Sequence, residues 1–214
     1  GWYVPAQSDT TLIWFHGNAG NISHRLTNLL LLHHELRVNL FIFDYRGYGR
    51  SNGSPSEEGL YIDAEAARNY ILSRPKGENN RVIFFGRSLG TAVAIELATR
   101  HEVNSIILES PLTSIRDIAT QAYPFIPANL LILPLQSRFD SLSKIGLVNS
   151  PVMILHGDMD NVVPYEGGKK LYDAANSPKR FFTIAGASHD DTVQVGGRPY
   201  VEALKAFIEN PRDE

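Results

Sequence analysis

Short apolar segments alternate with helix-forming segments along most of the chain, and this alternation constrains the fold more than any other feature of the sequence. The apolar segments are rich in Ile, Val and Phe and show little polar alternation, which is typical of strands buried on both faces of a parallel sheet. The predicted strands are Leu12–Phe15, Leu40–Phe43, Val82–Phe85, Ile106–Leu108, Val152–Leu155 and Phe181–Ile184. Repeated strand–helix–strand units predict an α/β fold in which helices flank both faces of a mostly parallel sheet.

The segments between the strands carry helical patterns of apolar residues. Those expected to share one face of the first helix are Ile22, Leu26, Leu29, Leu30 and Leu36. The second helix is predicted to open at Ser54, with Pro55 in the first turn and Glu57 closing a capping box. Small residues dominate the third helix, Thr91–Ala98, which indicates tight packing against the sheet. The apolar face of the last helix is expected to carry Val201, Leu204 and Ile208.

The length of 214 residues suits a single domain with one core. We therefore predict one α/β domain over residues 1–214. Thr113–Ile145 interrupts the alternation because it contains several prolines and no clear strand pattern, so we expect a small cap-like insertion at about 112–147. Gly1–Pro5 has the pattern of a strand end with nothing before it to pair, and we expect an N-terminal segment to be missing.

Composition excludes several classes of protein. The net charge is −3 and no basic block with interleaved aromatics is present, so we expect no nucleic-acid partner. The lack of cysteine excludes disulfides, thiolate metal sites and cysteine nucleophiles. The histidines and carboxylates show no metal-ligand spacing and the glycines no nucleotide-binding motif, so neither metal nor cofactor is expected. The most apolar stretch, Phe125–Leu135, is too short to span a bilayer.

One predicted strand leads directly into a Gly-x-Ser-x-Gly motif. Val82–Phe85 is followed by Gly86–Gly90 and then by a helix of small residues. This is the context of a nucleophile elbow, a sharp strained turn that lifts a serine hydroxyl above the sheet. Flanking glycines permit such a turn, and Gly86 and Gly90 provide them. Ser88 is therefore the predicted nucleophile, and a glycine-rich turn without chemistry is the alternative.

A serine hydroxyl needs a neighbouring base to take its proton. In proteins with this elbow the chain order is serine, acid, histidine. His189 follows the last predicted strand, so it lies at the carboxyl edge of the sheet, where ligands bind in such folds. His33 and His34 fall within a helix, and His101 is expected to interact with the C-terminus of the third helix. His189 is the predicted base.

Two carboxylates compete for the role of the acid that orients the histidine. Both follow Val152–Leu155. Asp160 lies further into the loop, from where it can turn back towards His189, whereas Asp158 is close to the strand end and can cap the loop or the next helix. We predict Asp160. Glu109, at the end of the preceding strand, is a further alternative, and otherwise it is expected to hold loop N–H groups.

Two backbone N–H groups are expected to hold the oxyanion that forms during acyl transfer. Leu89, at the start of the helix after the elbow, is the first donor. The second should come from the glycine-rich loop Phe15–Asn21 after the first inner strand. We predict the N–H of Asn18 there, with Ala19 as the alternative. The alternative is that this glycine-rich loop only caps the following helix and has no catalytic role.

Taken in chain order, five motifs resemble those of the alpha/beta-hydrolase-domain serine hydrolases. They are His16–Asn21, Asp44–Ser51, Gly86–Gly90, His156–Pro164 and Gly186–His189. The resemblance is greatest to a cap-poor subgroup that includes eukaryotic protein depalmitoylases and many bacterial esterases. It implies the alpha/beta-hydrolase fold, a triad of Ser88, Asp160 and His189, and a structural role for Asp44–Ser51 in holding the active-site loops. It also implies strands ahead of Gly1, the region that carries a membrane anchor in some members.

These observations predict a serine hydrolase that cleaves carboxylic ester or thioester bonds without a cofactor or metal. The expected substrate is a small or lipid-like acyl ester, with an acylated protein at a membrane surface as a further candidate. The cytoplasm is the favoured location, with an anchor in the missing segment as the alternative. Tyr123, Phe125, Ile126 and Leu130–Leu133 are expected to line an acyl-chain site, face lipid or pack beneath a loop.

Two rival functions use the same residues. An amidase or peptidase would employ the same triad, because pocket residues that the sequence does not place decide which leaving group is accepted. A catalytically silent binding protein on this scaffold is the second rival, and the complete serine, aspartate and histidine set favours an enzyme over it.

Overall fold

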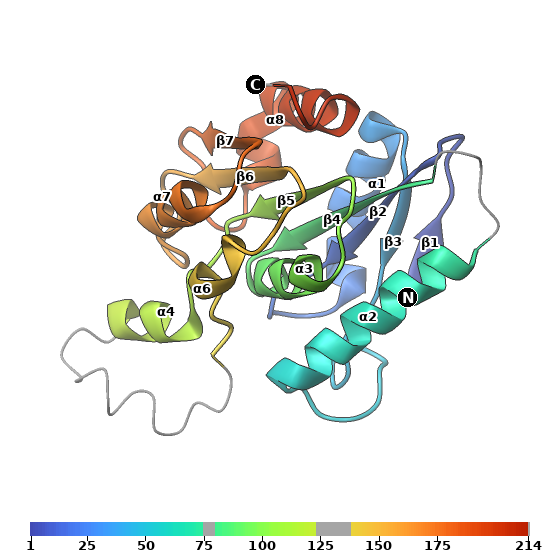
Figure 1. Ribbon diagram of the computed structural model, residues 1–214, viewed down its shortest axis with the longest axis horizontal. Coiled ribbons are helices and arrows are strands. Elements are labelled where there is room, and N and C mark those ends of the chain that lie inside the picture. Colours follow the sequence, from blue (N-terminus) through green and yellow to red (C-terminus); the bar gives the residue numbers. More distant parts are fainter. Residues whose placement is uncertain (75–79, 123–137, 214) are drawn as a thin grey trace.

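The computed structural model describes residues 1–74, 80–122 and 138–213. Within them the strands form one sheet in the order β1-β3-β2-β4-β5-β6-β7 (Figure 1). Their bounds are Trp2–Val4 (β1), Thr10–Phe15 (β2), Asn39–Ile42 (β3), Arg81–Arg87 (β4), Ser105–Glu109 (β5), Val152–Gly157 (β6) and Lys179–Ile184 (β7). Only β1 runs antiparallel to its neighbour, β3, and the other pairs are parallel. The predicted α/β fold is confirmed, and each of the six predicted strands overlaps one observed strand, with Phe43 alone lying beyond the end of its strand, β3.

β4 and β6 each continue two residues past their predicted ends, and β5 continues one residue, to Glu109. β4 extends to Arg87, which pairs in register with Glu109 of β5. β6 extends to Gly157, which pairs with Ile184 of β7. The hydrogen bonds between strands join backbone groups, so strand pairing can continue beyond the last apolar side chain. These extensions bring polar side chains to the carboxyl edge of the sheet.

Helices cover both faces of the sheet (Figure 1). Their bounds are Ile22–Arg25 (η1, a 3₁₀ turn), Leu26–Leu36 (α1), Glu57–Ser73 (α2), Leu89–Arg100 (α3), Ile115–Ala122 (α4), Leu142–Ile145 (α6), Tyr165–Ala174 (α7) and Thr192–Glu209 (α8). Residues of α1 and α8 share one buried apolar cluster with the sheet. Those of α2, α3, α6 and α7 share the cluster on the opposite face.

The buried face of the first helix differs from the prediction. Leu26 is 45% exposed and Leu30 is 55% exposed, whereas Leu29, Leu32 and Leu36 are buried. The chain first makes the 3₁₀ turn η1, which Asn21 caps. A 3₁₀ turn has fewer residues per turn than an α-helix, so it shifts the helical phase. Of the predicted face, Ile22, Leu29 and Leu36 are buried as expected, and the prediction is wrong for Leu26 and Leu30.

The second helix starts later than predicted. Ser56, rather than Ser54, is the N-cap, and its hydroxyl accepts a hydrogen bond from the N–H of Gly59 at 3.1 Å. Pro55 lies before the helix, and Glu57 receives a hydrogen bond from Tyr61 instead of closing a capping box. The predicted capping box is therefore wrong, although α2 begins within the predicted segment.

The last helix bends near its start. Gly197 has non-helical angles, φ 49° and ψ −135°, and Pro199 follows it. The three residues predicted for its apolar face, Val201, Leu204 and Ile208, are buried as expected. The bend separates the first turn of α8, which lies near the carboxyl edge of the sheet, from the longer segment that packs on the sheet.

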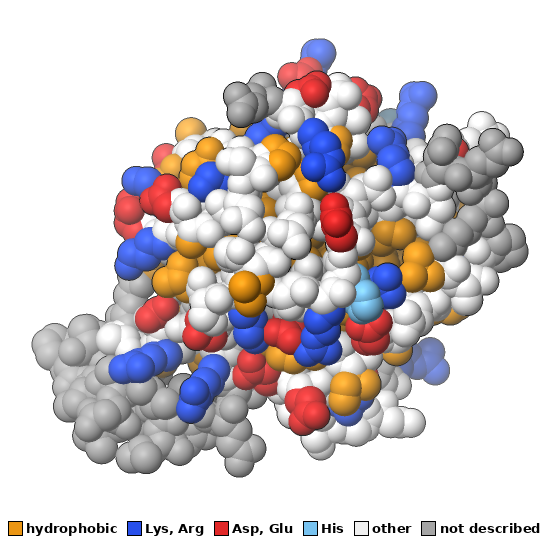
Figure 2. All heavy atoms as spheres, in the orientation of Figure 1, with side chains coloured by type: hydrophobic (Ala, Val, Ile, Leu, Met, Phe, Trp, Pro, Cys, Tyr) orange, Lys and Arg blue, Asp and Glu red, His pale blue; other side chains and the backbone are white. Residues whose placement is uncertain are grey.

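The predicted insertion is helical where the structure describes it, in α4 and α6. The expectation for Tyr123, Phe125, Ile126 and Leu130–Leu133 lies outside the described residues. On the face in Figure 2, basic and acidic side chains are interspersed with apolar ones. No helix within residues 1–74, 80–122 and 138–213 is both long and apolar enough to cross a bilayer.

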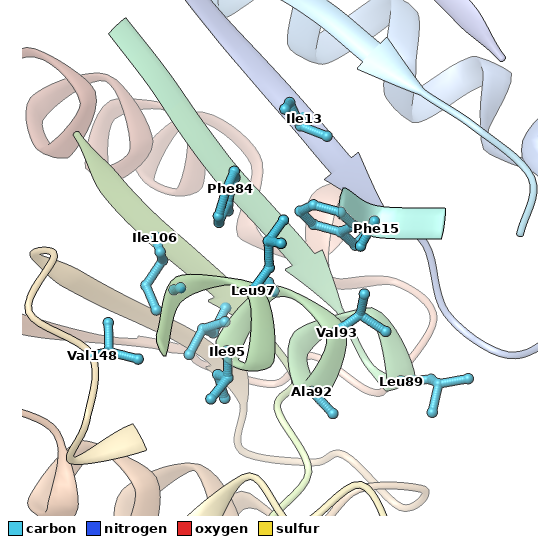
Figure 3. Packing of buried hydrophobic residues seen from close by; sticks show 14 of the residues in the cluster. Ile13, Phe15, Phe84, Leu89, Ala92, Val93, Ile95, Leu97, Ile106 and Val148 are labelled. Atoms are coloured by element: carbon cyan, nitrogen blue, oxygen red, sulfur yellow. The ribbon is translucent and has the colours of Figure 1, made fainter. Parts of the chain in front are cut away.

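The third helix packs closely on the centre of the sheet, as its small residues predict. Val93 and Leu97 of α3 belong to one buried cluster with Phe84 of β4 and Phe15 of β2 (Figure 3). Since α3 begins directly after β4, this packing fixes the position of the turn between them. Ser88 lies in that turn.

Candidate active site

The three side chains predicted to form a triad lie together at the carboxyl edge of the sheet. Ser88 is between β4 and α3, Asp160 follows β6, and His189 lies between β7 and α8. In a parallel sheet the carboxyl ends of neighbouring strands share one edge, which explains how residues far apart in sequence meet there.

The turn at Ser88 has an unusual backbone. Its φ is 52° and its ψ is −121°, a conformation that non-glycine residues rarely adopt. The N–H of Ser88 donates to the carbonyl of Glu109 at 2.9 Å, and the Ser88 carbonyl accepts from Thr91 N–H at 2.9 Å and from Thr91 Oγ1 at 2.6 Å. These bonds hold the strained turn, as a nucleophile elbow requires.

Glycines on either side of Ser88 allow the close packing of this turn. A Cβ on Gly86 would lie 2.6 Å from the carbonyl oxygen of Gly90. A Cβ on Gly90 would overlap the carbonyl oxygen of Phe15 at the end of β2. Both positions therefore exclude any side chain, and the helix after Ser88 rests directly on the backbone of the neighbouring strand.

The imidazole of His189 bridges the other two members of the predicted triad. Its Nε2 lies 3.2 Å from Ser88 Oγ, and its Nδ1 lies 2.8 Å from Asp160 Oδ2. A carboxylate can only accept a hydrogen bond, so Nδ1 carries the proton and Nε2 presents a lone pair to the serine hydroxyl. This arrangement can accept the proton of Ser88.

Asp160 is held in its ionised form. Its side chain is fully buried, and Oδ1 accepts hydrogen bonds from the N–H groups of Val162 at 2.9 Å and Val163 at 2.8 Å. Burial alone would raise the pKa of Asp160, but hydrogen bonds from His156, His189 and the Val163 N–H outweigh it and lower that pKa well below its usual range. The carboxylate is therefore charged at neutral pH and can stabilise a protonated His189.

His156 is a second histidine next to Asp160, and the sequence analysis did not assign it a role. Its Nε2 lies 3.0 Å from the carbonyl oxygen of Val163 and 3.4 Å from Asp160 Oδ2. Both neighbours are acceptors, so Nε2 carries the proton. The signal in the sequence was its position at the end of a buried strand, where a polar side chain needs a partner.

The two competing carboxylates have other partners. Asp158 accepts a hydrogen bond from the N–H of Gly186 at 2.6 Å and so joins the loop of Asp160 to the loop of His189. Glu109 accepts side-chain hydrogen bonds from Arg87, Thr192 and Tyr200. Its proposed role as an alternative acid is wrong, because His189 Nδ1 is bonded to Asp160. It binds side-chain donors rather than the loop N–H groups expected.

The glycine-rich loop after β2 lies against the nucleophile. A Cβ on Gly17 would be 3.3 Å from Ser88 Cβ. Within the described part of the chain, neither the N–H of Asn18 nor that of Leu89 has a protein acceptor among the hydrogen bonds. The Asn18 side chain accepts a hydrogen bond from Tyr48 at 2.6 Å. As far as the described residues show, these two backbone N–H groups are available to bind an oxygen atom.

The segment Asp44–Ser51 supports that loop. Asp44 Oδ1 accepts the N–H of Ile22 at 2.9 Å and lies 3.6 Å from Nε2 of the buried His16. Ser51 Oγ donates to the Asp44 carbonyl at 2.7 Å. Burial lowers the pKa of His16 below its ordinary value and so favours its neutral form. The structural role implied for Asp44–Ser51 agrees with these contacts.

The remaining histidines have ordinary partners. His33 Nε2 lies 2.9 Å from the carbonyl of Pro5, and His34 is bonded to Glu35 at the surface. His101 is the C-cap of α3, where its backbone N–H donates to the carbonyl of Leu97 at 3.1 Å, so its expected interaction with the C-terminus of that helix is confirmed for the backbone. Its ring is bonded instead to Glu65 of α2 at 2.8 Å.

A hollow beside the acid could receive part of a substrate. It has a volume of about 420 Å³ and is lined by Asp160, Asp158, Val162, Tyr165 and Ile118, among others. Ligand sites are concave and combine apolar walls with a few polar groups. In the described ranges, no three His, Asp or Glu side chains are grouped so that they could hold a metal ion.

Known proteins resemble this chain in sequence and fold. Residues 6–144 match the family described as serine aminopeptidase, S33. An uncharacterized protein of Mycobacterium tuberculosis is 35% identical over 211 residues, which cover 97% of this chain and 74% of the relative. Alpha/beta hydrolase domain-containing protein 17B of Homo sapiens is 35% identical over 198 residues, covering 92% of this chain and 66% of the relative. The Pyrococcus furiosus esterase Pf2001 has the same fold, with a TM-score of 0.80 at 20% identity over 97% of this chain and 85% of its own.

Proposed function

This chain belongs to the serine aminopeptidase S33 family of alpha/beta hydrolases, and from that premise we propose that it is a serine hydrolase that cleaves carboxylic ester or thioester bonds. The family and fold implied by the sequence motifs are confirmed. The proposal goes beyond the family and fold in two respects: it names the residues that carry out the reaction and the kind of bond that is cleaved. The proposal assigns Ser88 as nucleophile, His189 as base, and Asp160 as the acid that orients it.

One observation carries the proposal. His189 is placed between Ser88 Oγ and Asp160 Oδ2, at 3.2 Å and 2.8 Å from its two ring nitrogens. Both distances lie within or at the edge of the range expected of a nucleophile, base and orienting group. The strained turn at Ser88 supports the same assignment, as do the N–H groups of Leu89 and Asn18, which have no acceptor among the described residues.

In the acylation step, Ser88 Oγ attacks the carbonyl carbon of the substrate while His189 Nε2 takes the hydroxyl proton. A new C–O bond forms and the carbonyl electron pair moves to the oxygen, which the N–H groups of Leu89 and Asn18 hold. Asp160 stabilises the imidazolium. When the intermediate collapses, the bond to the alcohol or thiol breaks, and His189 returns the proton to the leaving group.

In the deacylation step, water enters in place of the leaving group. His189 removes a proton from it as its oxygen attacks the acyl carbon. The second tetrahedral intermediate expels Ser88 Oγ, which receives the proton from His189. The carboxylic acid leaves and the free enzyme is restored. These steps need only groups from the chain and water, so the proposal includes no cofactor.

The experiment compares Ser88→Ala with wild type on nitrophenyl esters of increasing acyl length and on an acyl thioester. The control is Ser73→Ala, which removes an exposed hydroxyl at the end of α2. Ser88→Ala should lower kcat by about 10⁶-fold and abolish labelling by a fluorophosphonate, whereas Ser73→Ala should behave as wild type. Turnover or labelling that survives Ser88→Ala unchanged would refute the proposal.

An aminopeptidase is the second candidate, because the family description names one. The same triad would act on an amide, and the comparison that separates the two is kcat/KM on matched ester, thioester and anilide substrates with one acyl group. A preference for the anilide would favour the peptidase. A wild-type chain that neither turns over a substrate nor reacts with a fluorophosphonate would favour a binding protein.

The substrate class follows from the surface and the hollow beside Asp160. Acidic side chains are interspersed among the basic ones on the face in Figure 2, so this face offers no continuous basic surface for nucleic acid. Ile118 and Val162 give the hollow apolar walls. We propose that an acyl or alcohol group of the substrate buries its apolar surface there. We retain the cytoplasm, including its membrane surface, as the proposed place of action.

A further inference from the structure

A buried network of charged and polar side chains lies beneath the triad, and the mechanism above does not use it. Glu109, at the end of β5, is 1% exposed. Its Oε1 accepts from Arg87 Nε at 3.0 Å and from Thr192 Oγ1 at 2.6 Å, and its Oε2 accepts from the Tyr200 hydroxyl at 2.6 Å. All four side chains are buried. The carboxylate thus receives three donors, two of them from α8.

Arg87 connects this network to the base. It immediately precedes Ser88 in the chain, and its Nη2 donates to the backbone carbonyl of His189 at 2.6 Å. The same side chain also binds Glu109 through Nε. One guanidinium therefore links the strand that carries the nucleophile with the backbone of the residue that carries the imidazole.

Glu109 holds the nucleophile turn as well. Its backbone carbonyl accepts the N–H of Ser88 at 2.9 Å, while its side chain binds Arg87 and the first part of α8. The turn of Ser88 and the loop of His189 are thus both anchored to the end of β5. The contact between Ser88 Oγ and His189 Nε2 is the point where these two anchored segments meet.

Stability does not explain such a network. Burying two charges costs free energy that their attraction often only balances, and apolar pairs of similar volume serve a core at least as well. A planar guanidinium offers something else, since it makes directed hydrogen bonds to several acceptors in a fixed geometry. Here the guanidinium of Arg87 holds the backbone carbonyl of His189 in a fixed position.

We propose that Arg87 and Glu109 are positioning residues that set the distance between the hydroxyl of Ser88 and the imidazole of His189. The inference rests on the proposed function, because it assumes that Ser88 is the nucleophile. Neither side chain touches substrate. Each acts through the backbone: Arg87 through the carbonyl of His189, and Glu109 by orienting Arg87 and the start of α8.

The first test is Arg87→Met, compared with Arg198→Met, which removes the arginine of an exposed ion pair on α8. Rates are expressed per active site titrated with a fluorophosphonate. Arg87→Met should lower kcat by about 10- to 100-fold, the usual cost of misplacing a catalytic group by about 1 Å. KM should stay within about threefold, because the substrate contacts are intact. Arg198→Met should leave both constants unchanged.

The second test separates positioning from stability, since an unpaired buried Glu109 can prevent folding of the single variant. The double variant Arg87→Met with Glu109→Gln removes both charges, while the amide can still pair with the hydroxyls of Thr192 and Tyr200, so it should regain most of the stability lost in Arg87→Met. Positioning predicts that kcat of this folded protein stays low. A double variant that is folded and has the kcat of wild type would overturn the inference.

A third variant leaves the charge pair in place. Tyr200→Phe removes one donor to Glu109 and should lower kcat less than Arg87→Met does, with KM unchanged. An unchanged kcat in all three variants, while turnover still requires Ser88, would reject positioning and leave the proposed function intact. Loss of the requirement for Ser88 itself would instead reject the proposed function.

Discussion

His156 Nε2 lies 3.4 Å from the same oxygen of Asp160 that accepts the hydrogen bond from His189 Nδ1 at 2.8 Å. Two histidines therefore face one carboxylate oxygen, and both rings turn a protonated nitrogen towards it. The other oxygen, Oδ1, accepts two backbone N–H groups. Asp160 is thus surrounded by donors, which is why it remains ionised although its side chain is buried.

Replacing Asp160 should damage turnover far more than replacing its neighbour Asp158. Asp160→Asn should lower kcat by about 10⁴-fold, because the amide cannot hold the same tautomer of His189. Asp158→Asn weakens one hydrogen bond to Gly186, a loss of about 1 kcal/mol, and should lower kcat by less than about tenfold. Steady-state kinetics on a nitrophenyl ester measures both. Equal losses in the two variants would contradict the assignment of the acid.

The ionised Asp160 should stabilise the fold only above a certain pH. The folded protein lowers its pKa below the value of about 3.9 of an unfolded aspartate. The stabilisation is therefore complete above that value and is lost as pH falls through the lower, folded-state pKa.

Urea unfolding of wild type and Asp160→Asn from pH 7 to pH 3 tests this. The free-energy difference should be on the order of 2 kcal/mol at pH 7 and should shrink below about pH 4. Asp173→Asn, a change at an exposed site, provides the baseline for general acid effects. A difference between wild type and Asp160→Asn that is constant down to pH 3 would count against the ionised carboxylate.

Two adjacent glycines of α7 should respond oppositely to alanine. A Cβ on Gly168 would overlap Nδ1 of His156, whereas one on Gly167 would meet Thr113 Cγ2 at an ordinary 3.6 Å. Gly168→Ala should destabilise the protein by about 1–3 kcal/mol and also lower kcat, since His156 contacts Asp160. Gly167→Ala should stabilise it by about 0.5–1 kcal/mol. Thermal unfolding and steady-state kinetics of the two variants measure these effects. A Gly168→Ala variant as stable as Gly167→Ala would show that the clash with His156 is absent.

The oxyanion donor assigned to Asn18 is a backbone group, so side-chain and backbone changes should differ. Asn18→Ala keeps the N–H and loses only the exposed bond to Tyr48, so kcat should fall by less than about fivefold. Asn18→Pro removes the N–H and should lower kcat by about 10²- to 10³-fold. Circular dichroism checks that Asn18→Pro is folded. If the two variants have the same kcat, the second donor is another group, with Ala19 first in line.

The sheet could be predicted from the sequence because its strands are buried on both faces and read as continuous apolar runs. The position of Ser88, Asp160 and His189 at one edge of the sheet could be predicted for a related reason. Each follows a predicted strand, so the topology alone brings them to one edge. Their interatomic contacts needed the structure.

Other features could not be predicted, for identifiable reasons. The rotated face of α1 depends on a 3₁₀ turn whose signal, the cap at Asn21, is only one residue. The role of Glu109 was missed because its partners Arg87, Thr192 and Tyr200 come from three separate segments. A carboxylate at a strand end indicates that it needs donors but does not identify them. A charge at position 87, after an apolar strand, was the available signal.

The contact between α3 and β2 has a consequence beyond packing. The helix that follows Ser88 rests on the backbone of Phe15, with no side chain between them at Gly90. The loop that carries the proposed second oxyanion donor starts where β2 ends. The proposed nucleophile and the proposed anion-binding loop are therefore aligned through contact between main-chain atoms. Mutations that reshape the substrate pocket can accumulate during evolution without disturbing this alignment, which lets one reaction centre be reused for new substrates.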